Sequence, residues 1–201
     1  ILKIITEKKE QEDPLKRTEE ILTIIKIHQN KTRQMSTLNN IILNHKQIHQ
    51  KIKRIAYQIY EANSSEKEVL IAGIQGNGMY FATQLAKTLQ EISTLDVHLC
   101  EVFIDKKKPL NTVSTSIEAS VYKNKSIVLV DDVLNSGSTL MYGIRHFLDV
   151  PLKRFKTAVL VNRNHKKYPV KGDFKGISLS TSIKEHVEVI FDKKNSKAYL
   201  V

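Results

Sequence analysis

The sequence has a single cysteine, Cys100, in 201 residues, and it has no long apolar run. One cysteine excludes a disulfide within the chain and suits the reducing cytoplasm, where we expect the protein to act. No apolar stretch approaches the roughly 20 residues of a membrane-spanning helix, so we expect no transmembrane segment. The chain also lacks C-x-x-C, H-E-x-x-H and Walker A patterns, so it contains no recognisable zinc site or P-loop nucleotide site.

The composition is that of a globular protein with an excess of positive charge. Hydrophobic residues make up 41% and charged residues 26% of the chain, which is long enough for one domain with a substantial core. The formal net charge is +11. This excess is typical of proteins that bind phosphates, nucleotides or RNA, but a lysine-rich solvated surface would produce it equally well.

Residues 1–34 differ in composition from the rest of the chain. They are rich in Ile, Lys, Glu and Gln, and they contain no glycine. We expect residues 1–34 to be an appendage that is not part of the core, and residues 35–201 to form the folded domain.

Periodic apolar residues predict helices that alternate with strands. After Asn44, a typical N-cap, isoleucines recur at helical spacing, and Phe81, Leu85 and Leu89 mark a second helix. We expect a third helix at 138–148 and strands at 68–72, 96–103, 126–130 and 157–161. This alternation predicts an α/β fold with a central, mostly parallel sheet flanked by helices.

Two unusual loops follow predicted strands, at 73–78 and at 131–139. Ligands of parallel α/β sheets bind at the carboxyl ends of the strands. We therefore expect the functional site where these two loops meet.

The stretch IVLVDDVLNSGSTL at 127–140 places two aspartates directly after an apolar strand. Buried carboxylates are costly unless they have polar partners, so Asp131 and Asp132 indicate that a ligand binds there. The small turn that follows, with its glycine and hydroxyl groups at the start of a helix, suits one phosphate, although it could also be an ordinary helix N-cap. Because the carboxylates could accept hydrogen bonds from vicinal hydroxyls, the combination fits a ribose 5-phosphate group.

This stretch is similar to the phosphoribosyl-pyrophosphate signature of type I phosphoribosyltransferases. Over residues 41–200 the chain resembles the bifunctional pyrimidine-operon attenuator / uracil phosphoribosyltransferase proteins, in the segments ILNHKQIHQKIKRIAYQI, IAGIQGNGMYFATQLAKTL, VLVDDVLNSGSTLMYGI and TAVLVNRNHKKYPVKGDFKGISLSTS. The resemblance implies the type I phosphoribosyltransferase fold with a small C-terminal hood. It further implies Mg²⁺ bound with phosphoribosyl pyrophosphate, transfer of phosphoribose to a nucleobase, uracil being favoured, and a homo-oligomer of two or more chains.

The resemblance also assigns a role to each unusual segment. Asp131 and Asp132 would be catalytic and would hold the ribose hydroxyls, directly or through Mg²⁺. The 5-phosphate would be bound by Asn135, Ser136, Gly137, Ser138 and Thr139, and the pyrophosphate by Gln75, Gly76, Asn77 and Gly78. A mobile loop within 104–120 would contribute Lys106, Lys107 and Lys108, and a hood at about 162–182 would bind the base through Asn162, Arg163 and Phe174. The alternatives are core packing of Phe174, a surface ion pair of Arg163, and an ordinary solvated turn at residues 106–108.

Four positions depart from the family pattern. Gln75 and Asn77 stand where the attenuator family has arginines, so they bring no positive charge to a leaving pyrophosphate. Ser138 likewise stands in place of an arginine, and Asn135 in place of the acidic residue proposed as general base in related purine enzymes. Three hypotheses therefore stay open: a uracil phosphoribosyltransferase, a catalytically weak nucleotide-sensing regulator that binds RNA, and a purine-salvage phosphoribosyltransferase.

Overall fold

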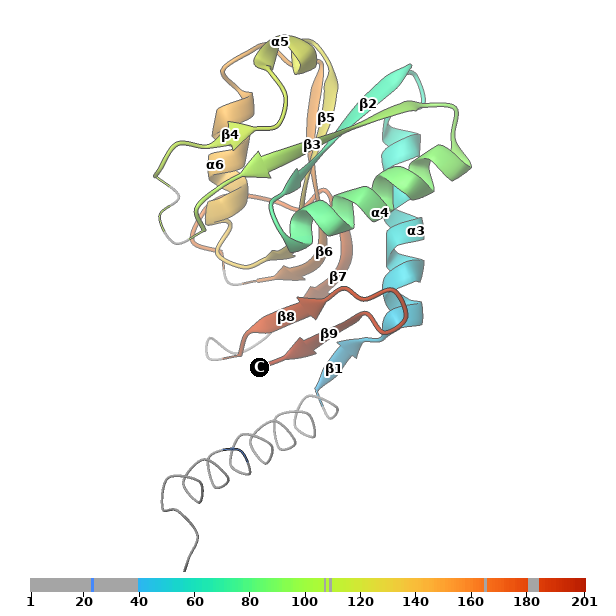
Figure 1. Cartoon of the computed structure of the whole chain (residues 1–201), viewed down its shortest axis with the longest axis vertical. Helices are drawn as coiled ribbons and strands as arrows, with labels where there is room; N and C mark the ends of the chain where they lie inside the picture. Colours follow the sequence, from blue (N-terminus) through green and yellow to red (C-terminus); the bar gives the residue numbers. More distant parts are fainter. Residues whose placement is uncertain (1–22, 24–39, 107, 109, 165, 181–184) are drawn as a thin grey trace, which may run out of the picture. The chain divides into compact units, whose positions relative to one another are not determined.

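The computed structural model describes residues 40–106, 110–164, 166–180 and 185–201, together with Thr23 and Lys108 (Figure 1). Apart from Thr23, the expected appendage at 1–34 lies outside these residues. Residues 42–201 form one compact unit. In the described part of the chain, no helix has the length and the apolar character that crossing a membrane requires.

A six-stranded sheet forms the centre of this unit. Its strands are β2 (Glu68–Ile74), β3 (Asp96–Phe103), β4 (Ser114–Thr115), β5 (Ser126–Leu134), β6 (Arg154–Arg163) and β7 (Phe174–Leu179). They lie in the order β4-β3-β2-β5-β6-β7, and all neighbours are parallel except the antiparallel pair β3 and β4. The predicted α/β class with a mostly parallel sheet is therefore confirmed.

Helices cover both faces of the sheet (Figure 1). They are α3 (His45–Ala62), α4 (Asn77–Ile92), α5 (Ala119–Tyr122) and α6 (Ser138–Phe147). The isoleucine stripe of α3 and the Phe81, Leu85 and Leu89 stripe of α4 pack in one hydrophobic cluster with one face of the sheet. Leu140 and Phe147 of α6 pack against the other face. As the helical spacing predicts, each helix buries one side and leaves the other in water.

A second, smaller sheet has the order β1-β9-β8. Its strands are β1 (Ile41–Leu43), β8 (Val187–Ile190) and β9 (Lys197–Leu200). The expected hood at 162–182 overlaps the central sheet in part of its length. Residues 174–179 form β7, which pairs in parallel with β6 and belongs to the central sheet.

Three segments are more regular than expected. β5 continues through both aspartates to Leu134, because its pairing with β6 extends to the register Leu134 with Asn162. β2 ends at Ile74 and α4 begins at Asn77, so the expected loop 73–78 shrinks to a tight turn. The loop expected at 104–120 contains β4 and the start of α5.

Candidate functional site

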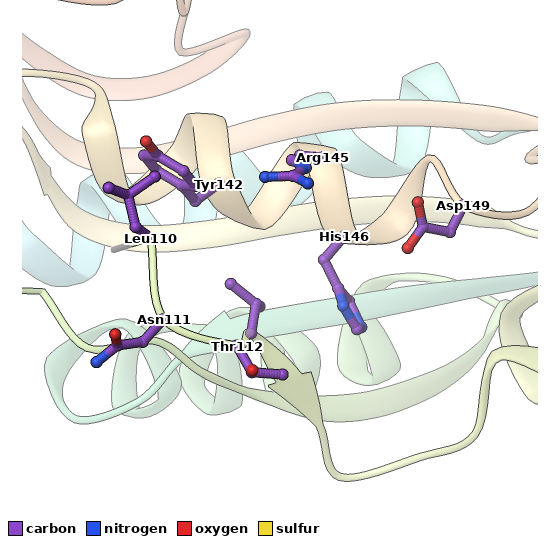
Figure 2. A pocket seen from close by; sticks show the side chains of 8 residues that line it. Leu110, Asn111, Thr112, Tyr142, Arg145, His146 and Asp149 are labelled. Carbon is purple, nitrogen blue, oxygen red and sulfur yellow. The ribbon is translucent and has the colours of Figure 1, made fainter. Parts of the chain in front are cut away.

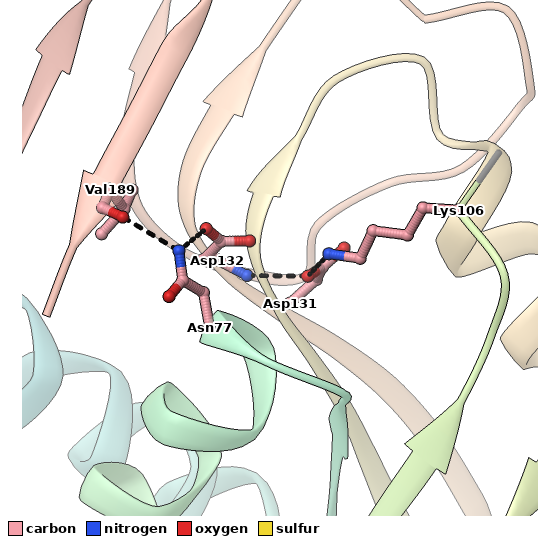
Figure 3. A network of polar contacts seen from close by, with 5 residues as sticks. All are labelled: Asn77, Lys106, Asp131, Asp132 and Val189. Atoms are coloured by element: carbon pink, nitrogen blue, oxygen red, sulfur yellow. Dashed lines mark hydrogen bonds and ion pairs between the residues drawn. The ribbon is translucent and has the colours of Figure 1, made fainter.

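The two aspartates lie at consecutive positions of β5, so their side chains leave opposite faces of the strand (Figure 3). Asp131 faces Lys106, which follows β3, with Nζ 3.4 Å from the Asp131 carboxylate oxygen Oδ1. Asp132 faces Asn77 at the start of α4, and the Asn77 amide nitrogen donates to Asp132 Oδ2 at 3.0 Å. The acidic pair is thus held between two different neighbouring segments.

Asp131 is the more deeply buried of the two, with 3% of the residue exposed. Burial, together with the negative charge of Asp132, raises the pKa of Asp131 to about 7, although Lys106 opposes this shift. Near neutral pH the Asp131 carboxyl can therefore either donate or accept a hydrogen bond. A group in this state suits a ligand that brings hydroxyls or a cation.

Asn77 does not keep its amide free for a ligand. Besides Asp132, its Nδ2 also donates to the carbonyl oxygen of Val189 in β8, at 2.9 Å, and its own carbonyl points away from Asp132 (Figure 3). The sequence suggested that this amide could donate to a pyrophosphate. In the structure both of its N–H groups already have acceptors within the protein.

Two glycines allow α4 to begin in close contact with the acidic pair. A Cβ at Gly78 would lie 3.1 Å from Asp131 Oδ1 and 3.1 Å from the Val130 carbonyl oxygen, closer than most side chains tolerate. Gly76, which precedes the helix, has a φ of 86°. A glycine is therefore needed at Gly76 for the turn and at Gly78 for the close approach.

The turn between β5 and α6 has the features of an anion site. Gly137 adopts the left-handed conformation at φ 82°, and as the N-cap residue of α6 it has no side chain that could cap the helix. Ser136 Oγ accepts from the Ser138 N–H at 3.3 Å, and the Ser136 carbonyl accepts from the N–H of Lys167 at 2.8 Å. These bonds hold the turn in shape while the free N–H groups and the helix dipole stay available for a phosphate.

A pocket of about 430 Å³ joins the acidic pair to this turn. It is lined by Asn77, Lys106, Asp131, Asp132, Val133, Asn135, Ser136, Thr139, Arg163, His186, Val187, Glu188 and Val189. A smaller hollow of about 50 Å³ adjoins it at the turn and also involves Gly137. The structure therefore brings the two loops together, as expected from the topology of parallel sheets.

Several expected site residues do not line this pocket. Gln75 and Gly76 are exposed in the α4 turn, and Lys108 is exposed with its N–H bonded to Asp105 at 3.1 Å. Ser138 begins α6 beside the pocket. Lys107 lies outside the described residues. Of the two expected lysines that the structure describes, Lys106 lies beside the acidic pair and Lys108 does not.

The three residues expected to bind the base lie in different places. Arg163 reaches the pocket: it is 2% exposed, donates to Asn135 Oδ1 at 3.1 Å, and also donates to the Glu185 carbonyl. Asn162 points away from it and donates to Ser178 Oγ at 3.2 Å. Phe174 is packed in the hydrophobic cluster on the α3 and α4 side of the sheet. Consecutive strand residues face opposite sides, which explains why Arg163 and Asn162 separate.

The wall formed by residues 186–189 was missed in the sequence. Its chain segment supplies Val187 and Val189, and also Glu188, whose Oε2 accepts from the Tyr199 hydroxyl at 2.6 Å. Nothing in its local sequence distinguishes β8 from other short strands. Only its tertiary contact, the hydrogen bond from Asn77 to the Val189 carbonyl, links it to the site.

A second pocket, of about 310 Å³, lies between α6 and the loop 110–113 (Figure 2). Tyr142, Arg145, His146 and Asp149 line it from one side of α6 and its C-terminal end. Asn111 on the opposite wall donates to Asp105 Oδ2 at 3.2 Å, in the segment that carries Lys106. None of the expected site residues lines this second pocket.

Comparison with known proteins identifies related sequences. A family model described as phosphoribosyl transferase domain matches residues 39–193. The bifunctional protein PyrR of Macrococcus caseolyticus is 30% identical over 164 residues, which cover 78% of this chain and 94% of that protein. The bifunctional protein PyrR of Streptococcus thermophilus is 32% identical over 151 residues, which cover 73% and 86%.

Two solved structures of similar fold are phosphoribosyltransferases named for hypoxanthine or for hypoxanthine and guanine. A hypoxanthine-guanine phosphoribosyltransferase from Bacillus anthracis aligns with a TM-score of 0.60 at 18% identity, over 70% of this chain and 82% of that chain. A hypoxanthine phosphoribosyltransferase from Trypanosoma cruzi, in complex with the product IMP, aligns with a TM-score of 0.63 at 15% identity, over 74% and 82%. At these identities the likeness shows a shared fold.

Proposed function

Because this chain belongs to the phosphoribosyltransferase family, we propose that its 430 Å³ pocket binds phosphoribosyl pyrophosphate with Mg²⁺ and transfers the phosphoribosyl group to a nucleobase. The observation that carries this proposal is the buried acidic pair of β5 beside the N-terminus of α6, whose N-cap residue is a glycine. Two carboxylates suit a diol, and the helix N-terminus suits a phosphate. Ribose 5-phosphate presents both groups at once.

In this proposal each part of the pocket binds one part of the substrate. The turn of Ser136 to Thr139 holds the 5-phosphate through backbone N–H groups and hydroxyls. Asp131 and Asp132 accept hydrogen bonds from the ribose hydroxyls. Lys106, whose side chain is 48% exposed beside Asp131, supplies a positive charge near the pyrophosphate.

The acidic pair also fits Mg²⁺. Within the described residues, no group of three or more His, Cys, Asp or Glu side chains could hold a metal ion. Mg²⁺ commonly binds through one or two carboxylates plus substrate phosphates and water, and Asp131 and Asp132 are two such ligands. The ion would neutralise charge on the leaving pyrophosphate.

The transfer breaks the bond between ribose C1 and a pyrophosphate oxygen, and it forms a bond from C1 to a nitrogen of the base. The transition state is positively charged at the ribose, so the nearby carboxylates stabilise it while the pocket walls exclude water. The base would lie against residues 186–189 and Arg163, since these line the same pocket as the acidic pair and the phosphate turn. The resemblance to the attenuator proteins favours uracil.

A regulator with weak or no turnover is the second candidate. It is favoured by the α4 turn, where Gln75 is exposed outside the pocket and both N–H groups of Asn77 are occupied. RNA would then be a partner of the basic surface, with an affinity that falls steeply as salt rises. Purine salvage loses one of its arguments, because Phe174 packs in the core.

The test is an assay of the full chain with Mg²⁺, phosphoribosyl pyrophosphate and either uracil, hypoxanthine, guanine, xanthine or adenine. We expect mass spectrometry to detect one nucleotide, UMP. Asp132→Asn is the matched control and should yield none. A chain that binds the substrate but forms no nucleotide would favour the regulator, and a chain that binds no phosphoribosyl pyrophosphate would refute the proposal. Light scattering of the same sample tests the expected homo-oligomer.

A further inference from the structure

One side chain connects three segments that surround the pocket. Asn77 is the first residue of α4, and its Nδ2 lies 3.0 Å from Asp132 Oδ2 in β5 and 2.9 Å from the Val189 carbonyl oxygen in β8 (Figure 3). Asp132 belongs to the central sheet and Val189 to the smaller sheet. The contact therefore joins the end of the pocket with the acidic pair to the wall of residues 186–189.

The chemistry of the partners determines the orientation of this amide. A carboxylate and a carbonyl oxygen are both acceptors, so the atom that faces them must be the NH₂ group of Asn77. An amide nitrogen has two hydrogens, and here each has an acceptor. Asn77 consequently has no side-chain N–H left for a pyrophosphate oxygen.

We propose that Asn77 is a positioning residue, which orients Asp132 for the ribose hydroxyls and holds β8 against the pocket, and that its side chain does not bind the pyrophosphate. The inference rests on the proposed function, because it assumes that ribose hydroxyls meet Asp132. Asn77 engages one Asp132 oxygen and thereby directs the other toward the pocket. A hydrogen bond to a charged group is among the stronger ones, so its loss frees Asp132 to adopt other rotamers.

The same contact couples the two ends of the pocket. Asp132 and the Val189 carbonyl share one amide group, so a displacement of β8 changes the position of the hydrogen bond to Asp132. Groups that share one hydrogen-bond network show non-additive effects when they are altered. We therefore expect the effects of altering Asn77 and Asp132 to overlap.

The test compares ribose 5-phosphate with phosphoribosyl pyrophosphate plus Mg²⁺ by calorimetry. The two ligands share the phosphate and the ribose hydroxyls, and only the second carries a pyrophosphate. We expect Asn77→Ala to weaken both by the same factor, about tenfold. Asn77→Asp keeps the size but places an acceptor against Asp132, so it should weaken both ligands further. Gln90→Ala and Gln90→Glu, at an exposed position of the same helix, are matched controls and should leave both affinities within twofold.

Each outcome has a distinct meaning. A selective loss of phosphoribosyl pyrophosphate in Asn77→Ala, with ribose 5-phosphate unchanged, would overturn the inference and return Asn77 to pyrophosphate binding. Combined with Asp132→Asn, Asn77→Ala should weaken binding by less than it does in the unaltered chain, and fully additive losses would also overturn the inference. Binding of neither ligand by the unaltered chain would instead overturn the proposed function. Circular dichroism of each variant separates these results from misfolding.

Discussion

The two turns that meet at the pocket have similar backbones and different uses. In each, a parallel strand ends, a glycine with positive φ follows, and a helix begins: Gly76 with φ 86° precedes α4, and Gly137 with φ 82° precedes α6. The α6 turn opens onto the pocket with its hydroxyls and free N–H groups. The first side chain of α4, by contrast, is bonded inside the protein.

This contrast shows that a loop's backbone alone does not make it an anion site. Both helix N-termini carry the partial positive charge that attracts anions. At α6 the pocket reaches the turn, whereas at α4 neither Gln75 nor Gly76 lines it. Of the two loops predicted from the sequence, the α6 turn therefore has the features of a phosphate site. The α4 turn is instead part of the framework around the acidic pair.

The largest effect is expected for Asp131→Asn, which alters the acidic pair of β5 beside the α6 turn. The pKa of Asp131 is raised from 3.8 to about 7 in the folded protein, so the folded chain holds a proton that the unfolded chain loses. Stability that is present below pH 4 is therefore lost as pH rises to about 7. The neutral variant should avoid this loss and gain on the order of 4 kcal/mol in free energy of unfolding above pH 7.

Urea denaturation at pH 4 and pH 8 measures this effect. The gain should be large at pH 8 and vanish at pH 4, while affinity for ribose 5-phosphate should fall. Asp149→Asn, at an exposed position, is the control and should change little at either pH. Equal stability of Asp131→Asn and the parent at pH 8 would show that the ionised Asp131 carboxylate does not destabilise the folded protein.

The next largest effect is expected for alanine substitutions at the two turn glycines. They distinguish the cost of an unfavourable backbone conformation from the cost of a Cβ that has no space. Gly76 combines φ 86° with ψ −127°, a conformation open essentially to glycine alone, yet a Cβ there would meet nothing within 4 Å. Gly137, at φ 82° and ψ −1°, lies in the left-handed region that other residues enter at lower cost. Gly76→Ala should cost about 2 kcal/mol and Gly137→Ala about 1 kcal/mol.

Thermal and urea unfolding of the two variants would rank these costs. Ligand binding should show the reverse order, because the α6 turn holds the phosphate: Gly137→Ala should weaken ribose 5-phosphate more than Gly76→Ala does. A stronger effect of Gly76→Ala on this ligand would contradict the division of labour between the two turns.

The smallest effect is expected for Lys106→Ala. Its ammonium lies 3.4 Å from Asp131 Oδ1, but its side chain is 48% exposed, so solvent screens the ion pair. Stability should change by less than about 0.5 kcal/mol. Affinity for phosphoribosyl pyrophosphate should fall severalfold in low salt, measured against Lys108→Ala as the control outside the pocket. Equal losses in both variants would mean that the charge of the loop matters rather than the position of Lys106.

Much of the fold could be predicted from local patterns. The isoleucine spacing of α3 and the apolar spacing of α4 correctly predicted two helices, and the alternation of strands and helices correctly predicted a parallel sheet. The stretch around Asp131 and Asp132 pointed to the loops that the structure brings together. Two adjacent aspartates after an apolar strand, followed by a turn of small residues, are unusual enough to be recognised from the sequence alone.

The base end of the pocket was less predictable. Arg163 and Asn162 are neighbours in sequence, yet only Arg163 reaches the pocket, because the strand sends them to opposite faces. Phe174 has an aromatic ring that could stack on a base, but its side chain packs in the hydrophobic core. The wall at 186–189 belongs to a strand that pairs locally with β9, but its contact with Asn77 spans 112 positions of the chain, so no local signal marked it as part of the site.

The sequence by itself determined which residue types carry the chemistry: two adjacent acids on a strand, a glycine and hydroxyl turn, and helices with one apolar side. These features depend only on residue types and on their spacing along the chain. Only the tertiary structure decided which groups remain free to bind a ligand. Asn77 lost its donors to Asp132 and Val189, and Asp131 was brought to a pKa near 7 by burial beside Asp132. Hydrogen bonding and burial depend on neighbours far away in the chain, and folding alone brings those neighbours together.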